Sequence, residues 1–450
     1  MSLAPRPSRA MVSWLTTVLV ASACQATSTP DASTAARSAA PAAVAGTDRP
    51  NILLIIADDF GIDTSPCYEL DAEKPDMPNL QSLCDEGVVF ETVWVNPQCT
   101  PTRAAILTGQ YGLRTGVLEV SDELEEDTTS IQDVLADQTA YSYSNAVIGK
   151  WHLGGETPEI THPTALGVQH YAGFLGGALD DYSNWYAFDG DTGDLATEYA
   201  TTWMTDRAID WIGGQSDTPW FLWLAYNAPH WPYHLPPADL HRHPGLSGEP
   251  ADVRANPRDY YLAMAEALDT EMGRLLDSMP PAVRDNTTIL FVGDNGTPAE
   301  VVAPPYDQGH AKSTVYEGGV RVPLVVAGHG VTRRGEREDS LVNGTDLFAT
   351  IARLGGHPDT AINDGISFDA AFTDPDFAGR THLYTEYPGG WAVRDARYKL
   401  IQHDSGERQL FDLQTDPLET QDLLASSPSP DVLAVADGLE AYQQDLQAAP

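Results

Sequence analysis

The apolar residues of this chain gather in five short runs that are rich in β-branched and aromatic side chains. Continuous apolar runs of this length are typical of strands that are buried on both faces, as in a mainly parallel sheet. The runs lie at residues 51–57, 145–149, 219–226, 288–292 and 322–327.

Longer amphipathic stretches separate these runs. Residues 102–108 follow Pro101, which stands at a favourable first helical position. Residues 197–213 and 258–279 place their apolar side chains at helical spacing. Strands that alternate with helices predict an α/β fold, in which helices sandwich a large mixed, mostly parallel sheet.

Beyond about residue 365 the pattern changes to short strands. Residues 381–386, 391–403 and 409–413 predict antiparallel strands, and residues 431–448 predict a helix. The sequence therefore predicts a main domain at residues 50–365 and a small C-terminal antiparallel-sheet subdomain at residues 366–450.

The first 49 residues are typical of an export signal and a tether. Two arginines precede an apolar stretch at residues 10–23, which is too short to span a bilayer and favours a signal peptide at residues 1–24. The stretch ends Ala-Ser-Ala-Cys, which resembles a bacterial lipobox with Cys24 as the lipidated residue; simple cleavage is the alternative. Residues 25–49 predict a flexible linker. We therefore expect an exported bacterial protein, periplasmic or lipid-anchored at the cell envelope.

The charge balance limits the partners. The 450 residues include 25 Lys and Arg against 65 Asp and Glu, a formal net charge of −40. Such a surface repels nucleic acid and anionic lipid, so we expect no nucleic-acid partner and membrane contact only through the N-terminal anchor. Any site for an anion must be a local basic pocket.

Reactive polar residues stand where four of the predicted strands end. In open α/β sheets, ligands bind beyond the carboxyl ends of the strands, so these side chains are expected at one rim. The groups are Asp58-Asp59, Lys150-Trp151-His152, Asn227 to His230, and Asp294-Asn295-Gly296.

The acids of this rim predict a metal site. Asp58, Asp59, Asp294 and the amide of Asn295 offer only oxygen ligands. Such ligands suit Ca²⁺, or Mg²⁺, better than Zn²⁺, which favours His and Cys.

One segment then identifies a resemblance. Residues 99–103 read Cys-Thr-Pro-Thr-Arg and are followed by Thr108-Gly109. This resembles the Cys-x-Pro-x-Arg motif of the formylglycine-dependent (type I) sulfatases, in the alkaline phosphatase superfamily. The similarity continues, in the family's order, through GKWHLG at 149–154, APHWPYHLPP at 228–237, DNG at 294–296, KSTVYEGGVRVPL at 312–324 and LFDLQTDPLETQDL at 410–423.

The resemblance implies a sulfuric ester hydrolase of the arylsulfatase type, with residues 50–365 as its catalytic domain. A modifying enzyme would convert Cys99 to formylglycine, whose hydrate would bind the metal with Asp58, Asp59, Asp294 and Asn295. One hydroxyl would attack sulfur and give a covalent sulfoenzyme intermediate.

The remaining implied roles fall to basic residues. Arg103 would support the hydrated aldehyde, and Lys150 and Lys312 would bind sulfate oxygens. His152 would assist release of sulfate, and His230 would bind the ester and act as general acid. Fixed cations suit this chemistry because negative charge builds on the oxygens in the transition state.

The substrate is less constrained. Residues 166–186 resemble a region of N-acetylgalactosamine-4-sulfatase-like relatives, and their aromatic side chains are available either for sugar stacking or for the core. We expect a sulfated carbohydrate, with aryl sulfates as artificial substrates. The alternatives are a phosphodiester or phosphonate monoester hydrolase on the same fold, and an inactive glycan-binding lipoprotein.

The cysteines add one expectation. If Cys24 is lipidated and Cys99 is modified, Cys67 and Cys84 remain. In an oxidising compartment they are expected to form a disulfide; two reduced, buried thiols are the alternative.

Overall fold

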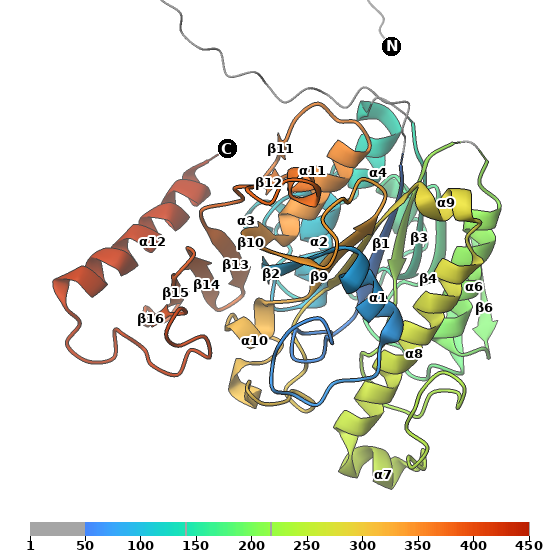
Figure 1. The fold of residues 1–450 in the computed structure, drawn as a ribbon, viewed down its shortest axis with the longest axis horizontal. Helices are drawn as coiled ribbons and strands as arrows, with labels where there is room; N and C mark the ends of the chain where they lie inside the picture. Colours follow the sequence, from blue (N-terminus) through green and yellow to red (C-terminus); the bar gives the residue numbers. More distant parts are fainter. Residues whose placement is uncertain (1–49, 140–141, 217, 450) are drawn as a thin grey trace, which may run out of the picture. The chain divides into compact units, whose positions relative to one another are not determined.

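The computed structural model describes residues 50–139, 142–216 and 218–449 (Figure 1). The signal peptide, Cys24 and the linker at residues 25–49 lie outside the described residues, so export and lipidation stay predictions. Within the described part of the chain, no helix is long and apolar enough to cross a membrane.

A 10-stranded sheet forms the centre, in the order β10-β2-β9-β8-β1-β7-β3-β4-β5-β6. Pairing is parallel for β8-β1-β7-β3-β4 and for β10-β2, while β9 runs antiparallel to β2 and β8, and β5 to β4 and β6. The mixed, mostly parallel sheet is therefore confirmed. The strands are β1 Asn51–Ala57, β2 Val88–Trp94, β3 Ser144–Lys150, β4 His170–Phe174, β5 Trp185–Asp189, β6 Thr192–Ala196, β7 Trp220–Ala225, β8 Thr287–Gly293, β9 Leu324–Gly328 and β10 Glu336–Asn343.

Helices cover both faces of this sheet (Figure 1). Alternate residues of β1 supply two separate cores, because successive side chains of a strand point to opposite faces. Leu53 and Ile55 pack with residues of α1, α6 and α8, whereas Ile52 and Leu54 pack with residues of α2 and α11. The bounds are α1 Pro78–Glu86, α2 Cys99–Thr108, α6 Ala200–Gly213, α8 Pro257–Ser278 and α11 Gly344–Leu354.

Short elements make up the connections. They are α3 Gly112–Thr115, α4 Ile131–Asp133, α5 His162–Ala165, α7 Pro250–Ala255, α9 Pro281–Asp285, α10 Glu317–Val320, the hairpin β11 Ala361–Ile362 and β12 Gly365–Ile366, a π-helical turn Val134–Gln138, and the 3-10 turns Gln308–His310 and Asp369–Phe372.

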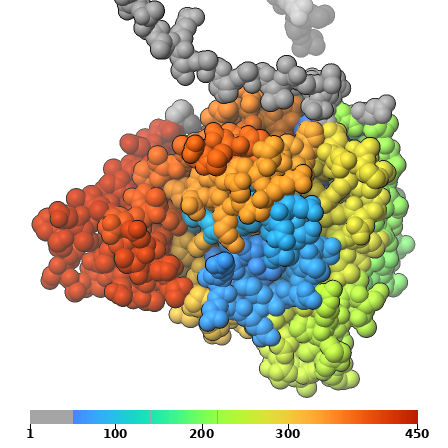
Figure 2. Space-filling model, viewed as in Figure 1, coloured from blue at the N-terminus to red at the C-terminus, as the bar shows by residue number. Residues whose placement is uncertain are grey.

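A second, antiparallel sheet follows near the C-terminus, as predicted. It comprises β13 Leu383–Tyr387, β14 Gly390–Arg394, β15 Tyr398–His403 and β16 Arg408–Asp412, and α12 Pro430–Ala448 packs on it. Figure 2 shows these residues as one contiguous patch on this face of the molecule. The domain boundary at residue 365 stays a prediction.

One predicted strand, residues 391–403, is wrong in its extent. The chain turns between β14 and β15 because the Asp395 side chain accepts hydrogen bonds from the backbone N–H of Arg397 and of Tyr398, at 2.7 Å and 2.6 Å. This local turn competes with an uninterrupted strand.

Cys67 and Cys84 form a disulfide, as predicted, with their Cα atoms 6.2 Å apart. It ties the loop after β1 to α1. The two cysteines are 17 residues apart in the sequence, so the cross-link removes conformational freedom mainly from the unfolded chain.

We expect the double variant Cys67→Ala/Cys84→Ala to unfold at lower denaturant concentration, with a loss of about 3 kcal/mol from the chain-entropy relation. Denaturation of wild type and variant with and without reductant measures this. The variant should be insensitive to reductant. Equal stability of wild type in both conditions would contradict the prediction.

A buried charge network joins the second sheet to the central one. Lys399 of β15, whose side chain is fully buried, lies 2.6 Å from Glu419 and 3.3 Å from Glu317 of α10. Arg394 of β14 also pairs with Glu317, at 3.2 Å, and Trp94 of β2 donates its indole N–H to the same carboxylate. Because breaking such a pair leaves a buried charge, the network fixes how β14 and β15 sit against β2.

This network predicts a pH dependence of stability. Burial raises the pKa of Glu419 from 4.5 to about 7. The negative charge of Glu317 adds to this rise, and the positive charge of Lys399 opposes it. The folded state therefore binds more protons than the unfolded state between pH 4.5 and 7, and the free energy of unfolding falls as pH rises through that window. Despite burial, Lys399 and Arg394 hold the pKa of Glu317 below its ordinary value of 4.5. The contribution of Glu317 to the free energy of unfolding therefore changes only below pH 4.5.

Glu419→Gln should lose this slope, and the difference from wild type across the window should reach up to about 3 kcal/mol. Denaturant unfolding at intervals across the window measures it. Parallel curves for wild type and variant would show that Glu419 keeps an ordinary pKa.

Candidate active site

The structure brings together all the residues that the sequence predicts for the site. They follow four neighbouring parallel strands, β8, β1, β7 and β3, whose carboxyl ends share one edge of the sheet. Asp58 and Asp59 follow β1, Lys150 is the last residue of β3 and His152 comes two residues later. His230 follows β7, and Asp294 and Asn295 follow β8. Cys99 and Arg103 lie on α2, and Lys312 lies in the loop before α10.

The acidic side chains form one buried cluster. The backbone N–H of Asp59 donates to Asp294 at 3.1 Å, and the side-chain amide of Asn295 donates to Asp59 at 2.8 Å. Ligand atoms of Asp58, Cys99 and Asp294 all lie within 4.8 Å of one another. Asp58, Asp59 and Asp294 have almost no exposed surface.

This cluster fits a hard divalent cation. Among the described residues, no donor reaches two of its buried oxygens, Asp58 Oδ1 and Asn295 Oδ1. A buried oxygen without a partner is costly, and a cation that takes oxygen ligands would remove that cost at both atoms. The residues present therefore fit the metal that the sequence predicts.

Three cations surround the carboxylates. Arg103 donates to Asp294 Oδ2 at 3.1 Å and 2.8 Å and to the Lys150 carbonyl at 2.9 Å. Lys150 Nζ lies 2.6 Å from Asp58 Oδ2, and Lys312 pairs with Asp59. The formal charges balance, so a bound divalent cation would leave the pocket net positive inside a protein of charge −40.

The pKa values follow from burial and these neighbours. Burial and the Asp294 carboxylate raise the pKa of Asp58 to about 8, despite Lys150. Burial also acts to raise the pKa of Asp59, but Lys312 and His230 together hold it below its usual range. The cations of the protein thus balance the negative charge of Asp59 but only part of that of Asp58. A further positive charge, such as a metal ion, would fit beside Asp58.

Cys99 is the first residue of α2 and is buried. Helix N-termini favour negative charge on a neighbouring atom. Its Sγ lies 3.2 Å from His152 Nδ1, and Arg103 follows one helical turn later. Burial raises the pKa of the Cys99 thiol and lowers that of the His152 imidazolium, the latter with the help of Lys150. The encoded thiol is therefore protonated and the imidazole neutral.

Two residues of the site have a strained backbone. Asp59 and His152 both have positive φ, 65° and 57°. Non-glycine residues adopt this conformation rarely, and it persists where the surrounding structure fixes it, often at functional sites.

His230 lies at the open side of the cluster. Its Nε2 is 3.7 Å from Asp59 Oδ2, and its Nδ1 is 2.7 Å from the Trp231 carbonyl. That carbonyl can only accept, so Nδ1 carries a proton and Nε2 faces the site.

The sequence did not single out two tyrosines that hold the site loops. The Tyr182 hydroxyl lies 2.7 Å from the His230 carbonyl and 2.9 Å from the Asn227 carbonyl. The Tyr261 hydroxyl donates to the Asp59 carbonyl at 2.8 Å. Tyr182 falls within the aromatic stretch at residues 166–186, but both of its carbonyl partners are remote in sequence and no local signal indicates them.

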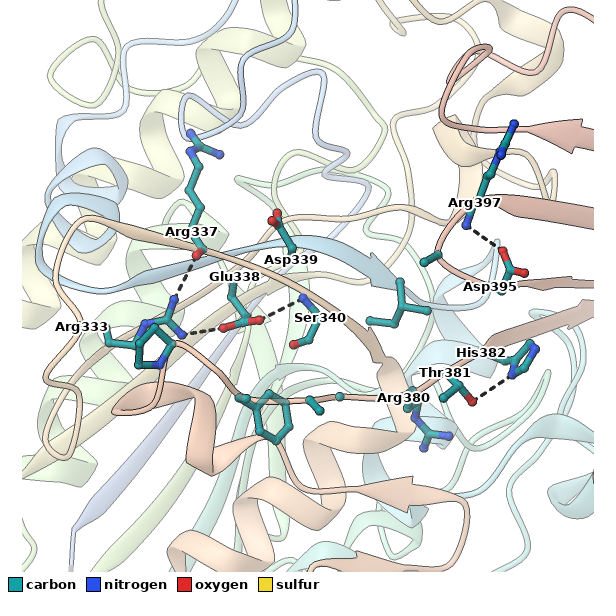
Figure 3. Close-up of a pocket in the computed structure, with 16 residues that line it drawn as sticks. Arg333, Arg337, Glu338, Asp339, Ser340, Arg380, Thr381, His382, Asp395 and Arg397 are labelled. Atoms are coloured by element: carbon teal, nitrogen blue, oxygen red, sulfur yellow. Dashed lines mark hydrogen bonds and ion pairs between the residues drawn. The ribbon is translucent and has the colours of Figure 1, made fainter.

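A larger cavity, of about 810 Å³, lies away from these residues, between β10 and the loops around β13 and β15 (Figure 3). Its arginines already have carboxylate partners. Arg333 pairs with Glu338 at 2.5 Å, Arg397 with Asp412 at 2.6 Å, and Arg380 with Asp346. These paired guanidinium groups make a poor anion site, so the chemistry belongs to the sheet edge.

Comparisons with known proteins agree with this geometry. Residues 50–357 match the sulfatase family, and residues 309–445 match the C-terminal region of N-sulphoglucosamine sulphohydrolase. The first match covers more than half of the chain, and the protein belongs to the sulfatase family. It is a sulfuric ester hydrolase, as the sequence predicts.

Individual relatives are distant but extend over most of the chain. A sulfatase of Formosa agariphila is 27% identical over 86% of this chain and 87% of its own, and human arylsulfatase A is 26% identical over 89% of each. The crystal structure of Ps i-CgsB in complex with k-i-k-neocarrahexaose superposes with a TM-score of 0.75 at 25% identity, over 89% of this chain and 93% of the other.

The metal site predicts a ligand-dependent stability. Removing divalent ions with EDTA should lower the melting temperature, and CaCl₂ should restore it, because a ligand that binds only the folded state stabilises that state. Asp58→Asn should weaken or abolish the response. Asp269→Asn changes a buried carboxylate of α8 that accepts hydrogen bonds from the backbone at the start of α1. It is the matched control and should keep the response. A wild-type melting temperature that ignores EDTA and calcium would contradict the site.

Proposed function

We propose that this protein removes sulfate from a sulfated carbohydrate, with residue 99, converted from cysteine to formylglycine, as its nucleophile. The observation that carries the proposal is the position of Cys99. It begins α2 beside three carboxylates and three cations, with His152 Nδ1 3.2 Å from its sulfur. The structure contains the encoded thiol, which stands where the hydrated aldehyde would be.

Asp58, Asp59, Asp294 and Asn295 would hold the metal, for which we propose Ca²⁺, with Mg²⁺ as the alternative. When bound, such a cation lowers the pKa of a hydroxyl that it contacts and so favours a nucleophile at neutral pH. Arg103 holds Asp294 and keeps the N-terminal turn of α2 against the cluster.

Lys150, which pairs with Asp58, and Lys312, which pairs with Asp59, would bind sulfate oxygens. One hydroxyl oxygen of residue 99 forms a bond to sulfur while the bond from sulfur to the sugar oxygen breaks. The alcohol leaves with a proton. His230 would supply it from Nε2 in its doubly protonated form, because Nδ1 keeps its own proton on the Trp231 carbonyl. The product of this step is a sulfate ester of residue 99.

The second hydroxyl of residue 99 completes the cycle. It gives its proton to His152, the carbon–oxygen bond to sulfate breaks, and the aldehyde returns as sulfate leaves. Water then adds to the aldehyde. This sequence needs no attack of water on sulfur, which is the advantage of a geminal diol over serine.

Relatives support a carbohydrate substrate. Two of the matching relatives are N-acetylgalactosamine-6-sulfatases, and the Ps i-CgsB structure holds an oligosaccharide. Delivery to the cell envelope by the N-terminal signal, with an anchor at Cys24, would bring the enzyme to extracellular glycans. A modifying enzyme that acts on residues 99–103 is the further partner that the proposal requires.

Mass spectrometry of the peptide that contains residue 99 should find an aldehyde in place of the thiol. Cys99→Ala should reduce hydrolysis of 4-nitrophenyl sulfate to background, because the nucleophile itself is removed. The Cys67→Ala/Cys84→Ala variant should retain activity at a temperature where it stays folded. A fully active preparation with an unmodified thiol at residue 99 would refute the mechanism.

The same assay separates the alternatives. Wild type should hydrolyse aryl sulfate faster than aryl phosphate esters and phosphonate monoesters. The reverse order would favour the phosphodiester or phosphonate hydrolase. An aldehyde at residue 99 without turnover of any of these esters would favour a glycan-binding protein.

A further inference from the structure

The cavity at the active site extends beyond the groups that contact sulfate. Its volume is about 260 Å³, and it reaches from the buried Asp59 and the half-buried Lys312 to the exposed Trp231 and Glu300. This volume is slightly below the range of about 300–1,000 Å³ usual for pockets that enclose drug-sized ligands. The cavity therefore has room for one sugar ring and leaves the rest of a chain outside.

Trp231 forms one wall and is unusual in its exposure. Within the described part of the chain, it is the only tryptophan with more than half of its surface exposed, 54%. It follows His230 directly, and the His230 ring is bonded to the Trp231 carbonyl. A large, rigid apolar surface exposed beside a catalytic residue is typical of a ligand contact rather than of core packing.

Glu300 lies on the same cavity and is exposed. The Tyr233 hydroxyl donates to its Oε1 at 3.3 Å, which orients the carboxylate. Tyr233 itself is buried and packs edge-on against Tyr261. No Lys, Arg or His among the described residues pairs with Glu300, so its negative charge remains available to the cavity.

Trp231 and Glu300 define what the cavity accepts beyond sulfate. Lys150 and Lys312 are paired with Asp58 and Asp59 of the carboxylate cluster. The unpaired charge at the mouth is negative, and it repels a second anionic group while accepting hydrogen bonds from hydroxyls.

Resting on the function proposed above, we propose that the ring carrying the scissile sulfate stacks its C–H face on Trp231 and donates a hydroxyl or amide N–H to Glu300. The substrate class is thus a sugar ring with a single sulfate and no second anionic group on that ring. Trp231 and Glu300 are specificity-determining residues, and neither takes part in bond breaking.

The test uses full-length, calcium-loaded enzyme whose aldehyde at residue 99 has been quantified. Wild type is first assayed on 4-nitrophenyl sulfate and on a panel of ring-matched sugars. The panel pairs N-acetylglucosamine 6-sulfate with N-sulfoglucosamine 6-sulfate, and N-acetylgalactosamine 4-sulfate and 6-sulfate with the 4,6-disulfate. In the preferred pair, kcat/KM should be at least about tenfold higher for the singly sulfated sugar, since like charges in contact disfavour the other.

Variants of Trp231 and Glu300 then show which side chain accounts for the affinity for the sugar and which for the preference for a single sulfate. Trp231→Ala should lower kcat/KM for the best sugar by about 10- to 100-fold, mainly through KM, whereas Trp231→Phe should retain most of it. Tyr186→Ala is the matched control, because Tyr186 is equally exposed, at 55%, and does not line the cavity. Glu300→Gln should reduce the preference for the singly sulfated sugar towards unity, because it removes the negative charge at the cavity mouth.

The outcomes separate the two proposals. Failure of wild type on every sulfate ester refutes the proposed function. Hydrolysis of aryl sulfate but of no singly sulfated sugar overturns only the present inference. Equal sugar kinetics for wild type, Trp231→Ala and Tyr186→Ala also overturn it, as does a charge preference that is unchanged in Glu300→Gln.

Discussion

The structure depends on the compensation of buried negative charge at the carboxyl edge of the sheet. Three aspartates with almost no exposed surface meet there, and each has a cationic partner from a different element: Asp294 with Arg103 of α2, Asp58 with Lys150 of β3, and Asp59 with Lys312. An unpaired buried charge costs several kcal/mol, so these pairs fix α2, β3 and the Lys312 loop on β1 and β8. The same arrangement fits a divalent cation and an anionic ester. Stability and chemistry therefore rest on one set of contacts.

Much of the fold and of the site could be predicted from the sequence, because the residues that indicate them lie close together along the chain. Apolar runs buried on both faces have no polar alternation, so β1, β7 and β8 are visible as uninterrupted hydrophobic segments. Parallel pairing then brings their carboxyl ends together, and the polar residues that follow each run become neighbours without any knowledge of tertiary contacts. Cys99 and Arg103 come with a short motif on one helix. The disulfide followed from the small number of cysteines.

The features that the sequence did not predict depend on contacts between residues that are distant in sequence. β10 has the sequence EREDSLVN, and as an edge strand it carries charges that hide its strand character. The break between β14 and β15 rests on one Asp395 side chain. Tyr182 and the pair Glu317–Lys399 act across intervals of 48 and 82 residues, and the exposure of Trp231 is decided by what the fold leaves uncovered. None of these has a periodic or motif signal.

The burial that organises the site also determines when it can be made. Cys99 is only 1% exposed, and the pKa of its thiol is raised, so in the folded protein it is both inaccessible and a poor nucleophile. The residues around it form the first turn of a fully buried helix, so an enzyme that oxidises this side chain would have to reach it before that helix is packed. In the mechanism we propose, modification therefore precedes folding. The aldehyde would then be enclosed by the same ion-paired residues that would hold the metal and sulfate, which would tie the maturation of the enzyme to the order in which the chain folds.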